Sequence, residues 1–211
     1  MIIQTQDFRT REAPPFMAGS SHIMIYSNGK VAWVFFFIAA SQFIIGLIVA
    51  EALYPGYSIS TNYISDLGVG SSSMVFNVSI FLLGLLSIIG TYYLQRAFNF
   101  KVVTIILTIA AVAAMGVGIF TENSEPMHMV ASFFVFLFSG LSAISSCRLM
   151  KYPFNIIVIL LGLMSLLALI LFIVNIYFGL GVGGMERMIV YPILIWMIGF
   201  GSFLIAFPEK S

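Results

Sequence analysis

A polar, aromatic stretch decides the fold of this chain: Tyr54-Pro-Gly-Tyr-Ser-Ile-Ser-Thr-Asn-Tyr-Ile-Ser-Asp-Leu-Gly68. The runs on either side of it, residues 31–50 and 74–93, contain no Asp, Glu, Lys or Arg. Each run is long enough to cross a bilayer as an α-helix, which takes about 20 apolar residues. The polar stretch must therefore lie at one face of a membrane, between two helices that cross it.

The composition of the whole chain indicates a polytopic membrane protein. Of its 211 residues, 61% are hydrophobic and 8% are charged, and the mean hydropathy is +1.09. A soluble core of ordinary composition cannot bury so much apolar surface. The net charge of +1 provides no basic stripe for nucleic acid. A single cysteine, Cys147, excludes an internal disulfide and any CxxC motif.

The apolar runs predict six transmembrane helices. We place them at about residues 31–53, 74–93, 102–120, 127–147, 154–177 and 188–207. Connections this short force each helix to lie antiparallel beside its sequence neighbour, so the predicted fold class is all-α, an up-down bundle over residues 30–208. Residues 1–29 have no sustained helical period and are expected to form a cytoplasmic tail, within which Met17 or Met24 would also serve as a start position.

The distribution of charge predicts the orientation of the bundle. One side carries eight basic residues, namely Arg9, Arg11, Lys30, Arg96, Lys101, Arg148, Lys151 and Lys210, and the other side carries only Arg187. By the positive-inside rule both termini of this multi-pass protein face the cytoplasm, and we expect it in the plasma membrane. Five carboxylates lie on the predicted outer side: Glu51, Asp66, Glu122, Glu125 and Glu186.

Three outer loops and the adjoining helix ends hold the residues expected to form a polar vestibule for a ligand. The candidate ligand-binding residues are Tyr54, Tyr57, Asn62, Asn77, Glu186, Arg187, Tyr191 and Trp196. We expect Arg187 to meet a phosphate or another anion, and the aromatic rings to pack on apolar parts of the ligand. A kink at Pro192 would tilt Tyr191 and Trp196 toward the vestibule, whereas interfacial anchoring is the alternative for Tyr191.

Asp66, Glu122 and His128 are the candidate catalytic residues. His128 is the only histidine on the predicted outer side, and it could act as a general acid or base or as one metal ligand beside carboxylates. The structural alternatives are a hydrogen-bonded His128, an Asp66 that holds the loop backbone, and helix capping by Glu125 and Glu186. No metal or cofactor is assigned, and no ionisable group near the bilayer centre indicates a pump.

Gly179, Gly181 and Gly184 fit the pattern GxGxxG, which can bind a dinucleotide when it follows a strand. Here the glycines follow a membrane helix and face the predicted outer side. We interpret them as a tight turn that brings Glu186 and Arg187 over the bundle.

Short sequence motifs in these loops resemble those of a known family. They are Tyr54-Pro-Gly-Tyr57 with Asn62-Tyr-Ile-Ser-Asp-Leu-Gly68, Phe120-Thr-Glu122 with His128, and Gly183-Gly-Met-Glu-Arg187 with Tyr191-Pro192. Together they resemble, over residues 31–207, the small six-helix archaeal and bacterial membrane proteins of domain of unknown function 998. This resemblance implies the six-helix fold and topology and brings no activity with it.

Two more remote similarities bear on function. Tyr63-Ile-Ser-Asp66 is similar to the first outer loop of the six-helix Frag1, DRAM and Sfk1 group, which is associated with lipid organisation. The seven-helix ceramidase and progestin-receptor-like hydrolases also carry Ser, Asp and His near one membrane face. This chain lacks one of their spans and their three metal-binding histidines.

Three functional hypotheses follow from the sequence. The first is a non-enzymatic membrane protein that binds a lipid headgroup or a similar amphiphile in the outer vestibule. The second is a hydrolase or transferase that acts on a lipid or isoprenoid through Asp66, Glu122 and His128. The third is a structural subunit of a larger membrane complex or a homo-oligomer. The expected partners are membrane lipids, and nucleic acid is not among them.

Overall fold

The structure is a computed structural model that describes the backbone of residues 16–205 and the side chains of residues 28–202. Its α-helices are α1 (Phe16–Leu53), α2 (Ser73–Phe98), α3 (Lys101–Ile119), α4 (Met127–Ser145), α5 (Phe154–Ile173) and α6 (Gly181–Ile205). Short 3₁₀ turns occur in the connections, and residues 16–205 contain no strand. The predicted all-α, six-helix fold is confirmed.

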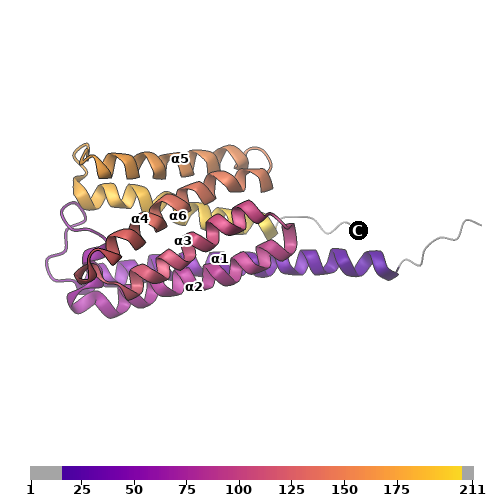
Figure 1. Cartoon of the computed structure of the whole chain (residues 1–211), viewed down its shortest axis with the longest axis horizontal. Coiled ribbons are helices and arrows are strands. Elements are labelled where there is room, and N and C mark those ends of the chain that lie inside the picture. The colour runs from indigo at the N-terminus through magenta and orange to yellow at the C-terminus, as the bar shows by residue number, and fades with distance from the viewer. Residues whose placement is uncertain (1–15, 206–211) are drawn as a thin grey trace, which may run out of the picture.

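The helices form a closed up-down bundle (Figure 1). Each helix packs against its neighbours in the sequence, and α6 packs against α1, which closes the ring. The connections dictate this arrangement, because a loop of a few residues cannot carry the chain back along the length of a helix.

All six helices are long and apolar enough to span a membrane. Their outward side chains are apolar: Ile45 is 62% exposed and Leu160 is 59% exposed. Gln42, the amide in the middle of the first span, turns inward, and its Nε2 donates to the carbonyl oxygen of Ser79 on α2 at 2.8 Å. An amide facing lipid would lack such a partner. The chain is an integral, multi-pass membrane protein.

Two helices differ from the predicted bounds in ways that matter. α6 begins at Gly181, seven residues before the predicted start, so Glu186 and Arg187 lie on the helix and not in a loop. α1 begins at Phe16, so residues 16–29 continue the first helix, where the sequence predicts a non-helical tail. The rest of that predicted tail, residues 1–15, lies outside the described residues.

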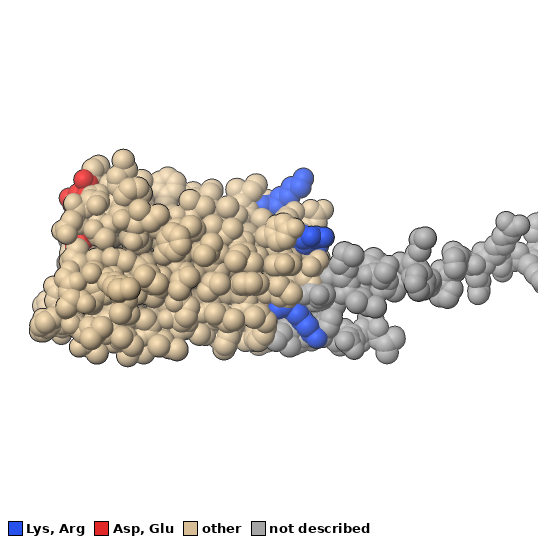
Figure 2. All heavy atoms as spheres, turned by 90° about the horizontal axis from the view of Figure 1, so that it is seen from below, with Lys and Arg blue, Asp and Glu red and all other residues tan. Residues whose placement is uncertain are grey.

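Charge separates along the bundle axis (Figure 2). The connections of residues 54–72, 120–126 and 174–180 meet at one end, which we call the acidic end. The opposite, basic end carries Arg96, Lys101, Arg148 and Lys151. This separation agrees with the count of charges in the sequence.

Close backbone contact holds the second half of α4 against the middle of α5. A Cβ placed on Gly162 would lie 2.8 Å from the carbonyl oxygen of Gly140, so only glycine allows the two backbones to approach this closely. The pocket described below lies between the same two helices, nearer the acidic end.

Candidate functional site

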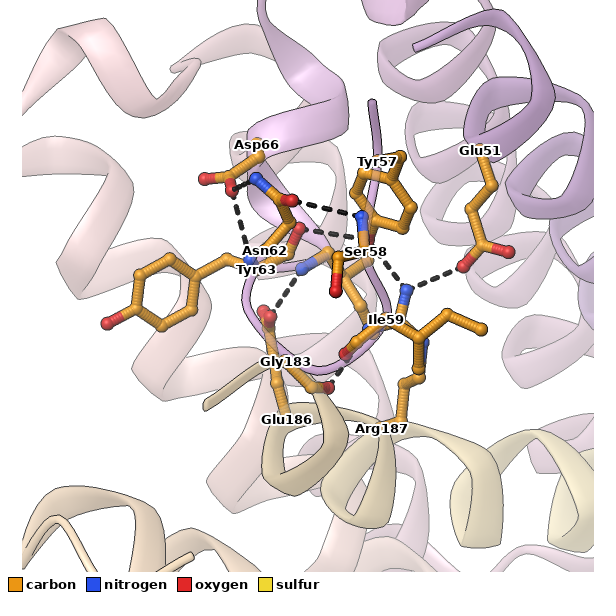
Figure 3. Close-up of polar contacts among 11 residues, drawn as sticks. Glu51, Tyr57, Ser58, Ile59, Asn62, Tyr63, Asp66, Gly183, Glu186 and Arg187 are labelled. Atoms are coloured by element: carbon orange, nitrogen blue, oxygen red, sulfur yellow. Dashed lines mark hydrogen bonds and ion pairs between the residues drawn. The ribbon is translucent and has the colours of Figure 1, made fainter. Parts of the chain in front are cut away.

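The long loop of residues 54–72 is a rigid structure held by its own polar side chains (Figure 3). The amide oxygen of Asn62 accepts from the backbone N–H of Ser58 at 3.1 Å, and its Nδ2 donates to Asp66 Oδ2 at 2.8 Å. The same carboxylate oxygen accepts from the N–H of Tyr63 at 3.0 Å. Asp66 therefore holds loop backbone, as in the structural alternative, and Asn62 supports the loop.

Arg187 fastens this loop to the bundle. Its Nη2 donates to Glu51 Oε1 on α1 and to the Tyr57 hydroxyl, both at 2.6 Å. Its Nη1 donates to the carbonyl oxygens of Gly183 at 2.9 Å and Ile59 at 3.3 Å. The side chain is buried and its charge is paired with that of Glu51. These contacts give Arg187 an anchoring role, and its contact with a ligand anion stays a prediction.

Tyr57 and Tyr54 belong to the same anchor. Burial raises the pKa of Tyr57 to about 12, so its hydroxyl stays protonated. The hydroxyl donates to the carbonyl oxygen of Tyr63 at 3.0 Å while it accepts from Arg187. Tyr54 packs edge-on against the Tyr57 ring, with centroids 5.5 Å apart.

The glycines before Glu186 allow the loop to lie across the first turn of α6. The N–H of Gly183 donates to the carbonyl oxygen of Ser60 at 3.2 Å. A Cβ on Gly183 would collide with the carbonyl oxygens of Asn62 and Ile59. Gly181 adopts a positive φ of 75°, which favours glycine. Gly181 thus serves a turn, as the sequence indicated, and Gly183 a close approach that the sequence did not indicate.

Glu186 and Arg187 point in different directions from α6 (Figure 3), because consecutive helical residues are about 100° apart. Its side chain is only 5% exposed, and its Oε2 accepts from the backbone N–H of Ile64 at 2.5 Å. The predicted capping role is wrong, since α6 begins five residues earlier and the carboxylate binds the long loop. Glu125 also makes no side-chain cap bond to α4.

A pocket of about 490 Å³ lies between α4, α5 and the long loop. Its polar wall contains Tyr63, Glu122, Glu125, His128 and Glu186. Its apolar wall contains Met129, Val130, Phe133, Phe134, Phe172 and Ile173. We call it the acidic-end pocket. Several residues of the apolar wall also face outward, such as Met129, which is 60% exposed, so the pocket opens between α4 and α5 toward the lipid-facing surface.

His128 is held in one orientation at the start of α4. Its Nδ1 lies 2.7 Å from the carbonyl oxygen of Phe120, which can only accept, so Nδ1 carries the proton. Its Nε2 lies 3.3 Å from Ser132 Oγ. The ring is buried, and it lines the pocket at the end of the bundle that the sequence predicted.

Glu122 is a partly buried carboxylate at the acidic end, outside the spans. Burial raises its pKa to about 7, and the neighbouring carboxylates of Asp66 and Glu125 add to the shift. The Asp66 and Glu122 carboxyls are therefore neighbours at the acidic end. Among the described residues no group of three or more His, Cys, Asp and Glu has a geometry for holding a metal ion.

A second, inner cavity of about 80 Å³ runs into the bundle from the acidic-end pocket. The two share Ser65, Ser132, Phe136 and Glu186 in their walls, and the rest of the inner wall is almost entirely apolar. Trp196 lines this cavity deep in the bundle, where its Nε1 donates to Ser146 Oγ at 2.9 Å. The expectation that Trp196 reaches the vestibule is wrong, since it lies about four helical turns below Gly181.

The structure thus divides the predicted site residues into two groups. Glu122, His128 and Glu186 line the acidic-end pocket, with Asp66 beside Glu122. The other predicted residues, Tyr54, Tyr57, Asn62, Asn77, Arg187, Tyr191 and Trp196, are not in its wall.

Asn77 and Tyr191, also in the second group, lie on α2 and α6. Asn77 donates to the carbonyl oxygen of Gly68 at 3.0 Å and so joins the long loop to α2. Tyr191 is 41% exposed on the outward surface of α6. It lies about 15 Å along the helix from Gly181, near the middle of the span Gly181–Ser202, so its position fits neither a vestibule role nor interfacial anchoring.

Sequence reasoning did not find the wall contributed by α4 and α5. Phe133, Phe134 and Phe172 look in the sequence like ordinary lipid-facing residues. Ser132 could have been predicted, because it follows His128 by one helical turn and must lie on the same face of the helix.

These features place the chain in a class: α-helical, multi-pass membrane proteins with a laterally open pocket beside a rigid, anchored loop. The family described as "Protein of unknown function (DUF998)" matches residues 37–202, and the chain belongs to this family. No curated protein and no solved structure matches the chain significantly. The similarity to the Frag1, DRAM and Sfk1 group stays a prediction.

Proposed function

We propose that this protein binds a lipid or a similar amphiphile, with the polar head in the acidic-end pocket and the tail between α4 and α5. The observation that carries the proposal is the composition of the pocket walls. Carboxylates and His128 form one wall, and lipid-facing apolar side chains form the other. A volume of about 490 Å³ is within the usual range for small-molecule sites.

The rigidity of the loop supports binding. Arg187, Asn62 and Asp66 hold the loop in one conformation without entering the pocket. A site whose walls are already ordered loses less conformational entropy when a ligand binds. The inner cavity gives the tail an apolar continuation past Ser132, into the bundle.

Lipid retention tests the proposal. Ser132 lines both cavities, and Ser132→Leu would narrow the passage between them. Ser202→Leu is the matched control, because Ser202 lies exposed near the basic end of α6. Native mass spectrometry should find bound lipid on the wild type and on S202L, and much less on S132L. Lipid-free wild-type protein, or equal retention by both variants, would overturn the proposal.

We further propose that the acidic end faces away from the cytoplasm, with both termini inside and the protein in the plasma membrane. The positive-inside rule supports this orientation, because the basic residues gather at the opposite end. Asn123→Cys at the acidic end and Tyr152→Cys at the basic end, each with Cys147→Ser, form a matched pair. An impermeant maleimide should label N123C on intact cells and Y152C only after permeabilisation. The reverse pattern would invert the orientation.

A second candidate function is acid-base chemistry on the bound amphiphile. The specific observation in its favour is that Glu122, which has the Asp66 carboxyl as a neighbour, lines the same pocket as an oriented His128. Membrane lipid extract incubated with the wild type would then change in composition, and the change would be lost in Glu122→Gln and His128→Gln. An extract that stays unchanged under conditions where lipid is bound would leave binding as the function.

A further inference from the structure

The charges in the acidic-end pocket indicate what kind of head group it takes. Resting on the proposed function, we propose that the amphiphile carries a positively charged head, an amine or a quaternary ammonium, and not a phosphate. Three observations support this inference: the sign of the lining charges, the surroundings of Glu186 and the aromatic wall.

The charged residues that line the pocket are carboxylates. Glu122, Glu125 and Glu186 contribute to its wall, and within residues 28–202 no Lys or Arg does. Arg187 follows Glu186 in the sequence, but its guanidinium points away from the Glu186 carboxylate, toward Glu51 and Tyr57 (Figure 3). A phosphate would meet only like charges here, and an ammonium would meet opposite ones.

Glu186 is a buried carboxylate with too few partners. It is 5% exposed and lies where the pocket meets the inner cavity. Among the residues whose side chains are described, its carboxylate receives one hydrogen bond, from the N–H of Ile64 to Oε2, and forms no ion pair. Removing a carboxylate from water is costly unless it is paired and hydrogen-bonded. A cationic head in the pocket would supply the missing partner.

The aromatic wall suits an organic cation. Tyr63, Phe133, Phe134 and Phe172 line the pocket, and Tyr63 and Phe172 pack edge to face with centroids 5.9 Å apart. Ring faces attract ammonium groups, and aromatic cages are a recurrent way to bind them. The rings also cover the methylene groups next to the charge.

Crowding of negative charge at the entrance agrees with a cationic head. The carboxylates of Asp66 and Glu125 help to raise the pKa of Glu122 to about 7. A bound cation would relieve their mutual repulsion, whereas a bound anion would increase it.

Amphiphiles with one tail and different heads provide the test. Equilibrium binding of labelled dodecyltrimethylammonium, dodecylamine and dodecyl phosphate is measured on the whole protein in neutral maltoside micelles, with protein-free micelles as the blank. The net charge of +1 keeps non-specific attraction of cations low. We expect saturable binding of the two cations and binding of the phosphate that is weaker by about tenfold.

Variants localise the effect. Glu122→Gln and Glu186→Gln should each weaken dodecyltrimethylammonium binding by about tenfold, and Glu122→Asp should retain it. Should E186Q fail to fold, E122Q and E122D decide. If dodecyl phosphate binds as tightly as the cations or more tightly, or if E122Q binds the cations as the wild type does, the proposal of a positively charged head group is wrong. The proposal that the protein binds an amphiphile is not affected by these outcomes. Binding of none of the three amphiphiles refutes the proposed function as well.

Discussion

Replacing Arg187 by methionine should cost the bundle about 3 kcal/mol of unfolding free energy. The buried guanidinium donates to Glu51, Tyr57 and two loop carbonyls, and methionine of similar length offers none of these bonds. Breaking a buried ion pair from one side costs about 3–5 kcal/mol. We take the lower end because the Glu51 side chain keeps 20% of its surface exposed and recovers some hydration.

A double-mutant cycle isolates the ion pair. Glu51→Gln keeps an oxygen that can accept from Nη2 and should cost only about 1 kcal/mol. We expect the stability loss of the double variant to be smaller than the sum of the two single losses by about 1 kcal/mol or more. The reason is that the neutral amide at position 51 leaves no unpaired charge behind when Arg187 is removed. Arg187→Lys should fall between wild type and R187M, because an ammonium cannot reproduce the planar fork.

Equilibrium unfolding in mixed micelles with increasing dodecyl sulfate measures these differences. A loss below about 1 kcal/mol for R187M, or strict additivity in the cycle, would show that Arg187 does not anchor the loop. The reasoning would also fail if R187M kept full stability and lost its bound lipid, because Arg187 would then be a ligand-binding residue.

Three further predictions concern stability and use the same unfolding assay. Gly183→Ala should cost about 2 kcal/mol or more of unfolding free energy, since its Cβ would strike two loop carbonyls. Gly199→Ala, with open space around it, should be neutral or slightly stabilising. Equal effects of the two variants would contradict the close approach at Gly183. Wild-type stability should fall as the pH rises from about 4.5 to about 7, because the unfolded chain loses the Glu122 proton at a lower pH than the folded protein does. Glu122→Gln should flatten this dependence of stability on pH. An unchanged dependence would argue against the raised pKa of Glu122. Trp196→Phe should cost about 1–2 kcal/mol through the lost bond to Ser146 and the smaller ring, and a loss near zero would refute that bond's contribution.

The sequence predicted which residues gather at the acidic end, but not how they are arranged there. Counting charges on each side of the apolar runs placed Glu122, His128 and Glu186 at one end of the bundle, and they do line one pocket. The roles of Glu186 and Arg187 were not predictable, because the glycine-rich segment before them concealed the start of α6 at Gly181. Once both lie on a helix, their separation of about 100° sends one to the pocket and the other to α1.

The apolar wall of the pocket and the position of Trp196 were not predicted, for a second reason. Along a membrane helix nearly every side chain is apolar, so the hydropathy of Phe133 or Phe172 does not reveal whether it faces lipid, a neighbour or a cavity. A kink at Pro192 suggested that Trp196 reaches the acidic end. The rise of about 1.5 Å per residue keeps it deep in the bundle even so.

Hydropathy, loop length and charge are properties of consecutive residues, and they suffice to establish that this chain crosses a membrane six times, with neighbouring helices antiparallel and its carboxylates gathered at one end. Three features became visible in the folded bundle alone: Arg187 anchors a loop, Glu186 stays in need of a partner, and a pocket opens between α4 and α5. They depend on how each helix is rotated about its axis, which is set by packing among residues far apart in the chain.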